Sequence, residues 1–170
     1  GNTVLWKPAS TALLNGYYLM KILEAAGLPP GVINFVPGKG SDVGRIVLPH
    51  PDLAGILTFG SQGPIGAARV LEDREVADKV ALVGGFSPGQ GVKYVKSGTI
   101  RGGYIWNPMT AGEIFTQLGV LLASGKEPTD GMELVGVGPV KVDAEKKLIQ
   151  AQKLEPLDKE NIDRLVEMGL

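Results

Sequence analysis

The chain has 170 residues, of which 44% are hydrophobic and 21% charged, a composition typical of a folded globular protein with a real core. The formal net charge of −1 argues against a nucleic-acid partner, and no apolar run approaches the roughly 20 residues of a membrane span. The sequence has no cysteine and a single histidine, which excludes disulfides, thiolate metal sites and thiol nucleophiles.

The first third of the sequence predicts strands that alternate with helices. Apolar residues recur at helical spacing between residues 11 and 27, where Ser10 or Thr11 can cap the helix and Gly27 can end it. A glycine-rich loop at residues 37–41 leads into a second helix, which ends before His50, an expected loop residue between two prolines. Strands are expected at residues 4–6, 32–36 and 53–59. This order is typical of one half of a parallel sheet.

The rest of the sequence continues the alternation and then changes character. Helices are expected at residues 65–79, 89–96, 109–123 and 159–168, and strands at 80–83, 100–106, 132–135 and 139–142. Residues 147–154 alternate as an exposed ribbon would. We therefore predict an α/β fold: a single doubly wound, Rossmann-like or flavodoxin-like domain. It has about five parallel strands in the order 2-1-3-4-5, followed by a C-terminal strand ribbon and helix.

Three sequence words in the first part of the chain carry a family resemblance: GNTVLWKPAS, ILEAAGLPPGVINFVPGKG and HPDLAGI. Through them residues 1 to about 58 resemble the cofactor domain of aldehyde dehydrogenases, most closely the pyrroline-5-carboxylate dehydrogenase branch. The resemblance implies that Lys7 contacts an adenosine ribose and that Ser10 stands at a position sharing this task. It implies a pyrophosphate contact for Ser61, although the chain reads FGS where the family reads FTGS. The family's catalytic cysteine has no counterpart in this sequence.

A second group of words, FGSQGPIGAARVLED, VALVGGFSPGQGVKYVKSG, GGYIWNPMTAG and DKENID, follows from residue 59 onward. This part is similar to the C-terminal part of type I periplasmic sugar-binding proteins, closest to their rhamnose- and autoinducer-binding branch. The resemblance implies that Ser87, Gln90 and Asn107 lie at strand ends that face a sugar cleft. Because a cleft needs two lobes, we interpret these three as mostly vacated polar positions. The helix at residues 109–123 must then find new packing or expose an apolar surface.

Each candidate binding residue also has a purely structural interpretation. Gly38, Gly40 and Gly44 form a G-x-G-x-x-x-G spacing, which resembles a phosphate cradle, but a tight turn alone requires such glycines. Lys7 beside Pro8 is equally typical of a solvated strand end. Ser61 can bind an anion at a helix N-terminus or serve as an ordinary N-cap, and we favour the N-cap.

The two resemblances meet near residues 55–59, which suggests an engineered chimera. We predict one α/β domain over residues 1–170, with a dehydrogenase-like half at 1–58 and a binding-protein-like half at 59–170. It is expected to have no catalytic residues, no metal, no cofactor and no native activity. A weak residual nucleotide binder and a truncated sugar-binding lobe stay open as alternatives. The sequence identifies no binding partner with certainty. A homo-oligomer that forms through the surface left by the absent lobe is one alternative. No signal peptide is recognised, and recombinant cytoplasmic expression is expected.

Overall fold

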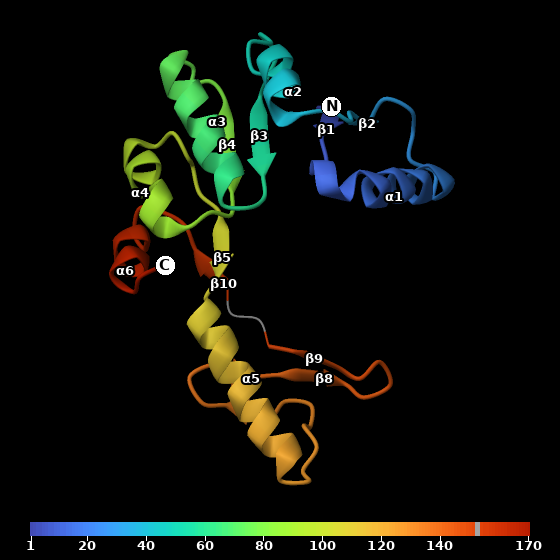
Figure 1. Cartoon of the computed structure of the whole chain (residues 1–170), viewed down its shortest axis with the longest axis vertical. Helices are drawn as coiled ribbons and strands as arrows, with labels where there is room; N and C mark the ends of the chain where they lie inside the picture. The colour runs from blue at the N-terminus through green and yellow to red at the C-terminus, as the bar shows by residue number, and fades with distance from the viewer. Residues whose placement is uncertain (152–153) are drawn as a thin grey trace. The chain divides into compact units, whose positions relative to one another are not determined.

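The computed structural model describes residues 1–151 and 154–170 and contains alternating strands and helices (Figure 1). The helices are the 3-10 turn η1 (Ser10–Ala12), α1 (Leu13–Ala25), α2 (Gly40–Val47), α3 (Gln62–Asp73), α4 (Pro88–Ser97), α5 (Pro108–Ala123) and α6 (Ile162–Glu167). The strands are β1 (Val4–Trp6), β2 (Ile33–Phe35), β3 (Gly55–Thr58), β4 (Ala81–Gly84), β5 (Tyr104–Trp106), β6 (Glu133–Leu134), β7 (Gly138–Pro139), β8 (Lys141–Asp143), β9 (Leu148–Gln150) and β10 (Leu154–Pro156). No helix in the described ranges is long and apolar enough to cross a membrane.

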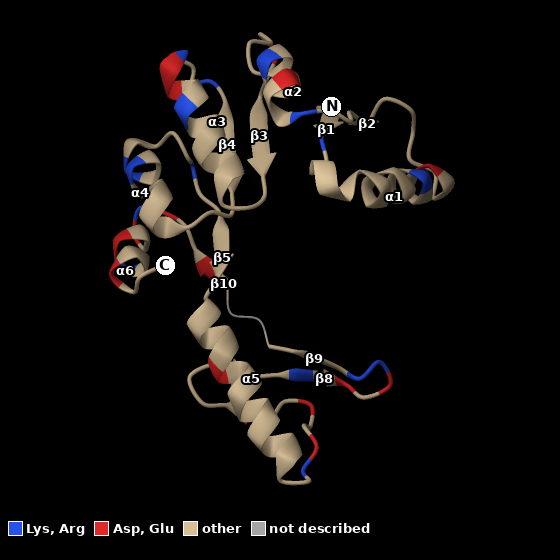
Figure 2. Cartoon of the chain, viewed as in Figure 1, with Lys and Arg blue, Asp and Glu red and all other residues tan. Residues whose placement is uncertain are grey.

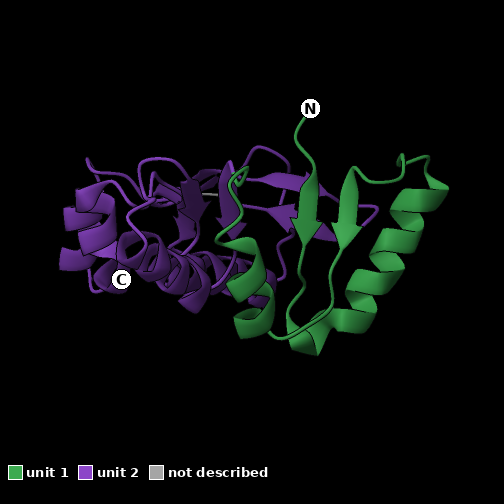
Figure 3. Ribbon diagram, turned by 90° about the horizontal axis from the view of Figure 1, so that it is seen from above, with its two compact units in different colours: residues 1–53 green, residues 54–170 purple. Residues whose placement is uncertain are grey.

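The chain divides into two compact units, residues 1–53 and 54–170, which Figure 3 colours separately. In unit 1, β1 and β2 pair in parallel with Trp6 opposite Phe35, and α1 connects them. The helix approaches the strands closely at Gly16, where a Cβ atom would lie 3.0 Å from the Phe35 ring. Gly27 ends α1 with a φ of +95°, in the left-handed region that favours glycine, as the sequence predicts.

In unit 2, β3 and β4 pair in parallel through α3, and a single parallel bridge joins Val83 to Gly102. β5 then pairs antiparallel with β10 in a separate two-stranded sheet. The α/β class is therefore observed, whereas the predicted order and number of parallel strands are not confirmed by these short pairings. Two hairpins, β6–β7 and β8–β9, form the ribbon that follows α5. Part of the predicted ribbon, Gln152 and Lys153, lies outside the described residues.

The hydrophobic core of the described residues lies in unit 2. α3 covers β4 and packs against α4, α4 packs against α6, and the carbonyl of Leu170 accepts a hydrogen bond of 2.9 Å from the amide of Gly89. The buried hydrophobic residues are Ala68, Leu71, Val80, Leu82, Phe86, Tyr94, Val95, Ile100, Leu134, Val140, Leu157, Ile162 and Leu165. Burial of this set is the main stabilising contribution of the fold.

Several predicted boundaries and caps are wrong. Neither Ser10 nor Thr11 caps α1, because η1 precedes the helix and no side-chain cap forms there. The helix predicted at residues 65–79 is α3, which starts and ends earlier. The strand predicted from residue 100 begins only at Tyr104, because Gly102 has a φ of +155° and Gly103 lies against the backbone of Gly84.

Candidate functional site

Lys7 and the loop before α2 come together at the carboxyl ends of β1 and β2. Lys7 directly follows β1. Its Cε atom lies close to Gly40, the first residue of α2, since a Cβ atom added to Gly40 would be 3.9 Å from it. In this position its Nζ atom donates a hydrogen bond of 2.8 Å to the carbonyl of Pro8. The side chain is therefore half-buried beside a helix N-terminus, where a cation and free backbone amides can both face an anion.

The other two unit-1 candidates differ in their surroundings. A Cβ atom on Gly38 would lie 3.1 Å from a methyl group of Val43, and the φ of this residue is +158°, so a larger residue there would be strained and crowded against α2. That contact supports the tight-turn interpretation of the glycine spacing. Ser10 is exposed in η1, and its hydroxyl forms none of the hydrogen bonds found in the described part of the chain.

The carboxyl end of β3 leads into α3 in unit 2, and Ser61 lies there. Ser61 holds the N-cap position, but its backbone is α-helical and its hydroxyl makes no capping hydrogen bond. The expected ordinary N-cap is therefore wrong for its side chain, because a capping hydroxyl requires an extended backbone at this position. Gly60, with a φ of +90°, makes the turn between strand and helix.

Thr58 is a residue of this turn that the sequence did not single out. Its Oγ1 atom is buried without a hydrogen-bond partner among the described residues, next to Gly63 in the first turn of α3. A buried hydroxyl without a partner is unfavourable by about 1–3 kcal/mol. The signal available in the sequence was its place at the end of a strand, three residues before Ser61.

The three residues expected at a sugar cleft have separate environments. Asn107 is 4% exposed, and its Oδ1 atom accepts a hydrogen bond of 2.9 Å from the amide of Met109, so it caps α5. Ser87 holds the N-cap position of α4 without a side-chain bond, and Gln90 is exposed in the first turn of that helix. No hydrogen bond in the described ranges joins Asn107 to either of the other two.

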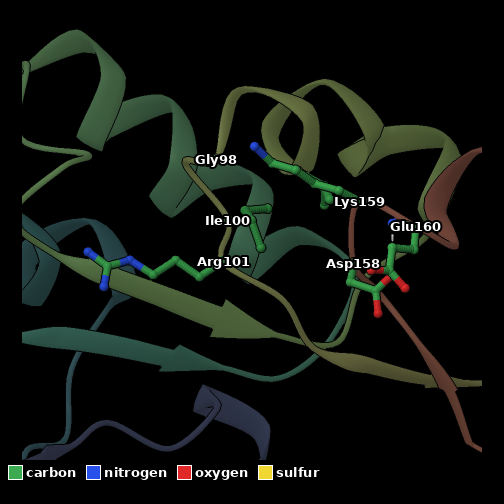
Figure 4. A pocket seen from close by; sticks show the side chains of 7 residues that line it. Gly98, Ile100, Arg101, Asp158, Lys159 and Glu160 are labelled. Atoms are coloured by element: carbon green, nitrogen blue, oxygen red, sulfur yellow. Dashed lines mark hydrogen bonds between the residues drawn. The ribbon is translucent and has the colours of Figure 1, made fainter.

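An open pocket of about 450 Å³ lies beside α4 in unit 2, and none of these candidates lines it (Figure 4). It is lined by Val95, Gly98, Ile100, Arg101, Asp158, Lys159 and Glu160. In Figure 4, Arg101 extends away from the acidic pair formed by Asp158 and Glu160, and its guanidinium donates to the carbonyl of Asp78 at 3.1 Å. A hydrogen bond from the Asn161 side chain lowers the pKa of Asp158, with backbone amides of Asn161 and Glu160 adding to it.

This pocket supplies no catalytic arrangement. Its charged groups diverge, and the carboxylate of Asp158 is occupied by the turn that it stabilises. A second pocket of about 590 Å³, between α1, the turn at residues 28–31 and β2, contains none of the candidate residues. Among the described residues, no group of three or more metal-ligating side chains could hold a metal ion.

The first half of the chain matches known proteins by sequence, whereas nearly the whole chain matches others by fold. Residues 1–87, about half of its length, match the model of the aldehyde dehydrogenase family, which extends beyond the boundary expected near residue 58. The chain is 47% identical over 66 residues to 1-pyrroline-5-carboxylate dehydrogenase 2 of Halalkalibacterium halodurans, covering 39% of this chain and 13% of that protein. It is 53% identical over 62 residues to 1-pyrroline-5-carboxylate dehydrogenase of Bacillus thuringiensis, covering 36% of this chain and 12% of the other. The chain thus spans about an eighth of the length of these relatives.

Two solved structures share the fold of nearly the whole chain. A sugar ABC transporter from Actinomyces odontolyticus superposes with a TM-score of 0.72 at 22% identity, covering 96% of this chain and 57% of the other. An ABC transporter solute-binding protein from Clostridium phytofermentas, solved with bound L-rhamnose, gives 0.61 at 17% identity, covering 99% of this chain and 60% of the other. Sequence similarity to dehydrogenases and the fold of a sugar-binding protein thus occur in one chain.

Proposed function

The chain belongs to the aldehyde dehydrogenase family through residues 1–87, and from this premise we propose that it is an engineered chimera without catalytic activity. In this proposal a fragment of a dehydrogenase cofactor domain is joined to a fragment of a sugar-binding lobe, with the join near residues 55–59, where the sequence changes character, although the family match itself runs to residue 87. The chimera is supported by the dehydrogenase match and the binding-protein fold in one chain, and the lack of dehydrogenase activity is supported by the absence of cysteine from the sequence. Without a thiolate, no thiohemiacetal forms with an aldehyde, and the family's hydride transfer has no substrate adduct to start from.

The activity test is direct. The purified chain is mixed with oxidised nicotinamide dinucleotide and glutamate semialdehyde, and the absorbance of the reduced cofactor is followed. We expect a rate equal to the protein-free blank. A matched assay with a full-length pyrroline-5-carboxylate dehydrogenase shows that the substrate is competent. Turnover by this chain above the blank, at a rate proportional to its concentration, would contradict the proposal.

We also propose that the two units complete one doubly wound domain over residues 1–170 with strand order 2-1-3-4-5. Two observations support this order: the parallel pairs β1–β2 and β3–β4, each connected by one helix. Pairing of β1 with β3 would satisfy the free backbone groups on the edges of both pairs. Nuclear Overhauser effects between the α-protons of one strand and the amide protons of the other, across Val4–Trp6 and Gly55–Thr58, are the expected result for a parallel pair. Their absence in a fully assigned spectrum would refute this order.

A second candidate function is weak binding of a dinucleotide. The observation in its favour is the place of Lys7 beside Gly40 at the start of α2, where the family resemblance implies a ribose contact. Trp6 precedes Lys7, so its fluorescence can report binding in a titration with oxidised nicotinamide dinucleotide. We expect a weak saturable change that Lys7→Ala abolishes. Lys21→Ala is the matched control, because Lys21 is an exposed lysine of the same unit that pairs with Glu24 at 2.8 Å.

The alternative of a truncated sugar-binding lobe has less support. Asn107, which the resemblance places at the cleft, is buried and occupied as a helix cap. Titration calorimetry with L-rhamnose is therefore expected to give a flat trace. A saturable heat that disappears in Gln90→Ala would instead favour the sugar-binding alternative over the proposed chimera without function.

A further inference from the structure

α5 presents several large apolar side chains to solvent. Phe115 is 75% exposed, Val120 66%, Met109 55% and Leu122 53%. Glu113 is the one charged residue of α5, which is otherwise drawn tan in Figure 2. The helix is held by Gln117, whose side-chain amide donates to the carbonyl of Val135 at 3.0 Å and accepts from its amide at 2.8 Å. Large exposed apolar patches of this kind mark interaction surfaces.

Four residues of this surface form one regular row. Gly112, Phe115, Gly119 and Leu122 follow each other at steps of three, four and three residues, which is the spacing of the contact positions of paired helices. A Cβ atom on Gly112 or Gly119 would meet nothing within 4 Å, so both glycines leave open space beside the helix. Glycines and large apolar residues therefore alternate along the row.

The row matches a second copy of itself that runs in the opposite direction, because its large residues then face its glycines. Phe115 and Gly119 lie two residues on either side of position 117, and Gly112 and Leu122 lie five residues on either side. An antiparallel second helix centred on position 117 consequently brings each large side chain over a glycine, as a two-fold symmetric contact requires. We propose that α5 pairs with α5 of a second copy of this chain. Phe115 then covers Gly119 of the partner subunit, and Leu122 covers Gly112 of the partner subunit.

Charge and area agree with a second copy as the occupant. At 1.5 Å per residue, the two Glu113 side chains are offset by about 12 Å along the helix axis, beyond the screening length at about 0.1 M salt. The two large side chains of the row, Phe115 and Leu122, offer roughly 200–300 Å² of apolar surface per copy. With the small residues of the row, two copies bury on the order of 600–800 Å², which is the size of a weak, transient contact. The dimer is therefore expected to depend on concentration.

Sedimentation equilibrium over a concentration series tests the dimer. We expect a monomer–dimer equilibrium for the chain and an association at least about 100-fold weaker for Phe115→Glu, which buries a charge at the centre of the contact. Ile46→Glu is the matched control, because Ile46 is 72% exposed in α2 and lies outside the row. A chain that stays monomeric at every concentration, or equal weakening by both variants, would overturn the proposal.

The variant Gly119→Leu distinguishes specific packing from non-specific hydrophobic association. The substitution adds apolar surface and favours the helix, so non-specific association would become stronger. In the proposed pair it fills the space that Phe115 of the partner subunit occupies, and the dimer is expected to be lost. Far-ultraviolet circular dichroism verifies that the variant keeps its helices. Stronger association of Gly119→Leu would refute the pairing.

Single cysteines locate the two-fold axis, since the native chain has none. In the proposed pair, residues 116 of the two copies are offset by about 3 Å along the axis and residues 123 by about 18 Å. Thr116→Cys should therefore form an intermolecular disulfide under mild oxidation, whereas Ala123→Cys, on the same exposed side, should not. Equal cross-linking of both variants would contradict an axis at position 117.

Discussion

A backbone carbonyl occupies the space where a side chain of Gly103 would lie. A Cβ atom at this position would overlap the carbonyl oxygen of Gly84, and the neighbouring residues are held by the bridge from Val83 to Gly102. Any larger residue must push β4 and β5 apart. We therefore expect Gly103→Ala to lower the free energy of unfolding by about 3 kcal/mol or more, measured by urea denaturation.

The matched control for this substitution is Gly66→Ala. Gly66 lies in the interior of α3, and a Cβ atom there would meet nothing within 4 Å. Because alanine favours a helix more than glycine does, this variant should gain about 0.5–1 kcal/mol. A comparable loss of stability in both variants would mean that the contact between Gly103 and Gly84 is not the cause.

The carboxylate of Asp158 gives the chain an acid-sensitive turn. Its Oδ1 atom accepts hydrogen bonds from the side-chain amide of Asn161 at 2.9 Å and from the backbone amides of Asn161 and Glu160. These bonds lower its pKa below the ordinary value of 3.8. A lowered folded pKa contributes stability that is complete above the ordinary value and is lost as the pH falls through the lower one.

Asp158→Asn tests this contribution. We expect the parent chain to be more stable than the variant at about pH 6, and the difference to shrink as the pH falls below the ordinary value of 3.8 and the carboxyl group becomes protonated. The measurement is the free energy of unfolding in urea at several pH values. A difference that stays constant across this range would show that the ionised carboxylate does not stabilise the turn.

At the scale of the helices, two N-cap positions offer a matched pair. Asn107 before α5 and Ser87 before α4 both have extended backbones and are both followed by proline, but only Asn107 makes a side-chain capping bond. Asn107→Ala should therefore cost about 1 kcal/mol, whereas Ser87→Ala should change the stability little. Thermal unfolding of the two variants measures the difference, and equal losses would contradict the assigned cap.

Most helices and strands follow from local signals in the sequence, and the exceptions have tertiary causes. The end of α1 was predictable because Gly27 supplies the left-handed residue that closes a helix. The late start of β5 was not, because it results from the contact of Gly103 with Gly84, a residue distant in sequence. β10 was only part of an expected ribbon, since its antiparallel pairing with β5 depends on a long-range meeting of two segments.

The candidate site was predictable in part. The place of Lys7 near the glycine loop follows from the parallel order of β1 and β2, which brings their carboxyl ends to one edge. The buried hydroxyl of Thr58 was missed, because alternation in a strand gives the face of a residue but not its hydrogen-bond partners. Asn107 also caps α5, which only the position of its Oδ1 atom reveals, and its place at a sugar cleft stays a prediction.

For the whole molecule, the distribution of burial predicts unequal stability. The buried hydrophobic residues of the described ranges all belong to residues 54–170, whereas β1 keeps Val4 and Leu5 about half exposed. Segments with few buried contacts open at lower free energy. Hydrogen exchange of the full chain should therefore be slowest for amides of β4 and α4 and markedly faster for β1 and β2. Equal protection in both units would contradict this expectation.

The bond pair between Gln117 and Val135 has a consequence for solubility. The side-chain amide of Gln117 satisfies both the carbonyl and the amide of the residue that follows β6, as a neighbouring strand would. Unpaired backbone groups at a strand edge recruit other chains into intermolecular sheets. By engaging both groups of Val135, whose side chain is 84% exposed, one glutamine protects this end of β6 from strand addition and so limits aggregation there.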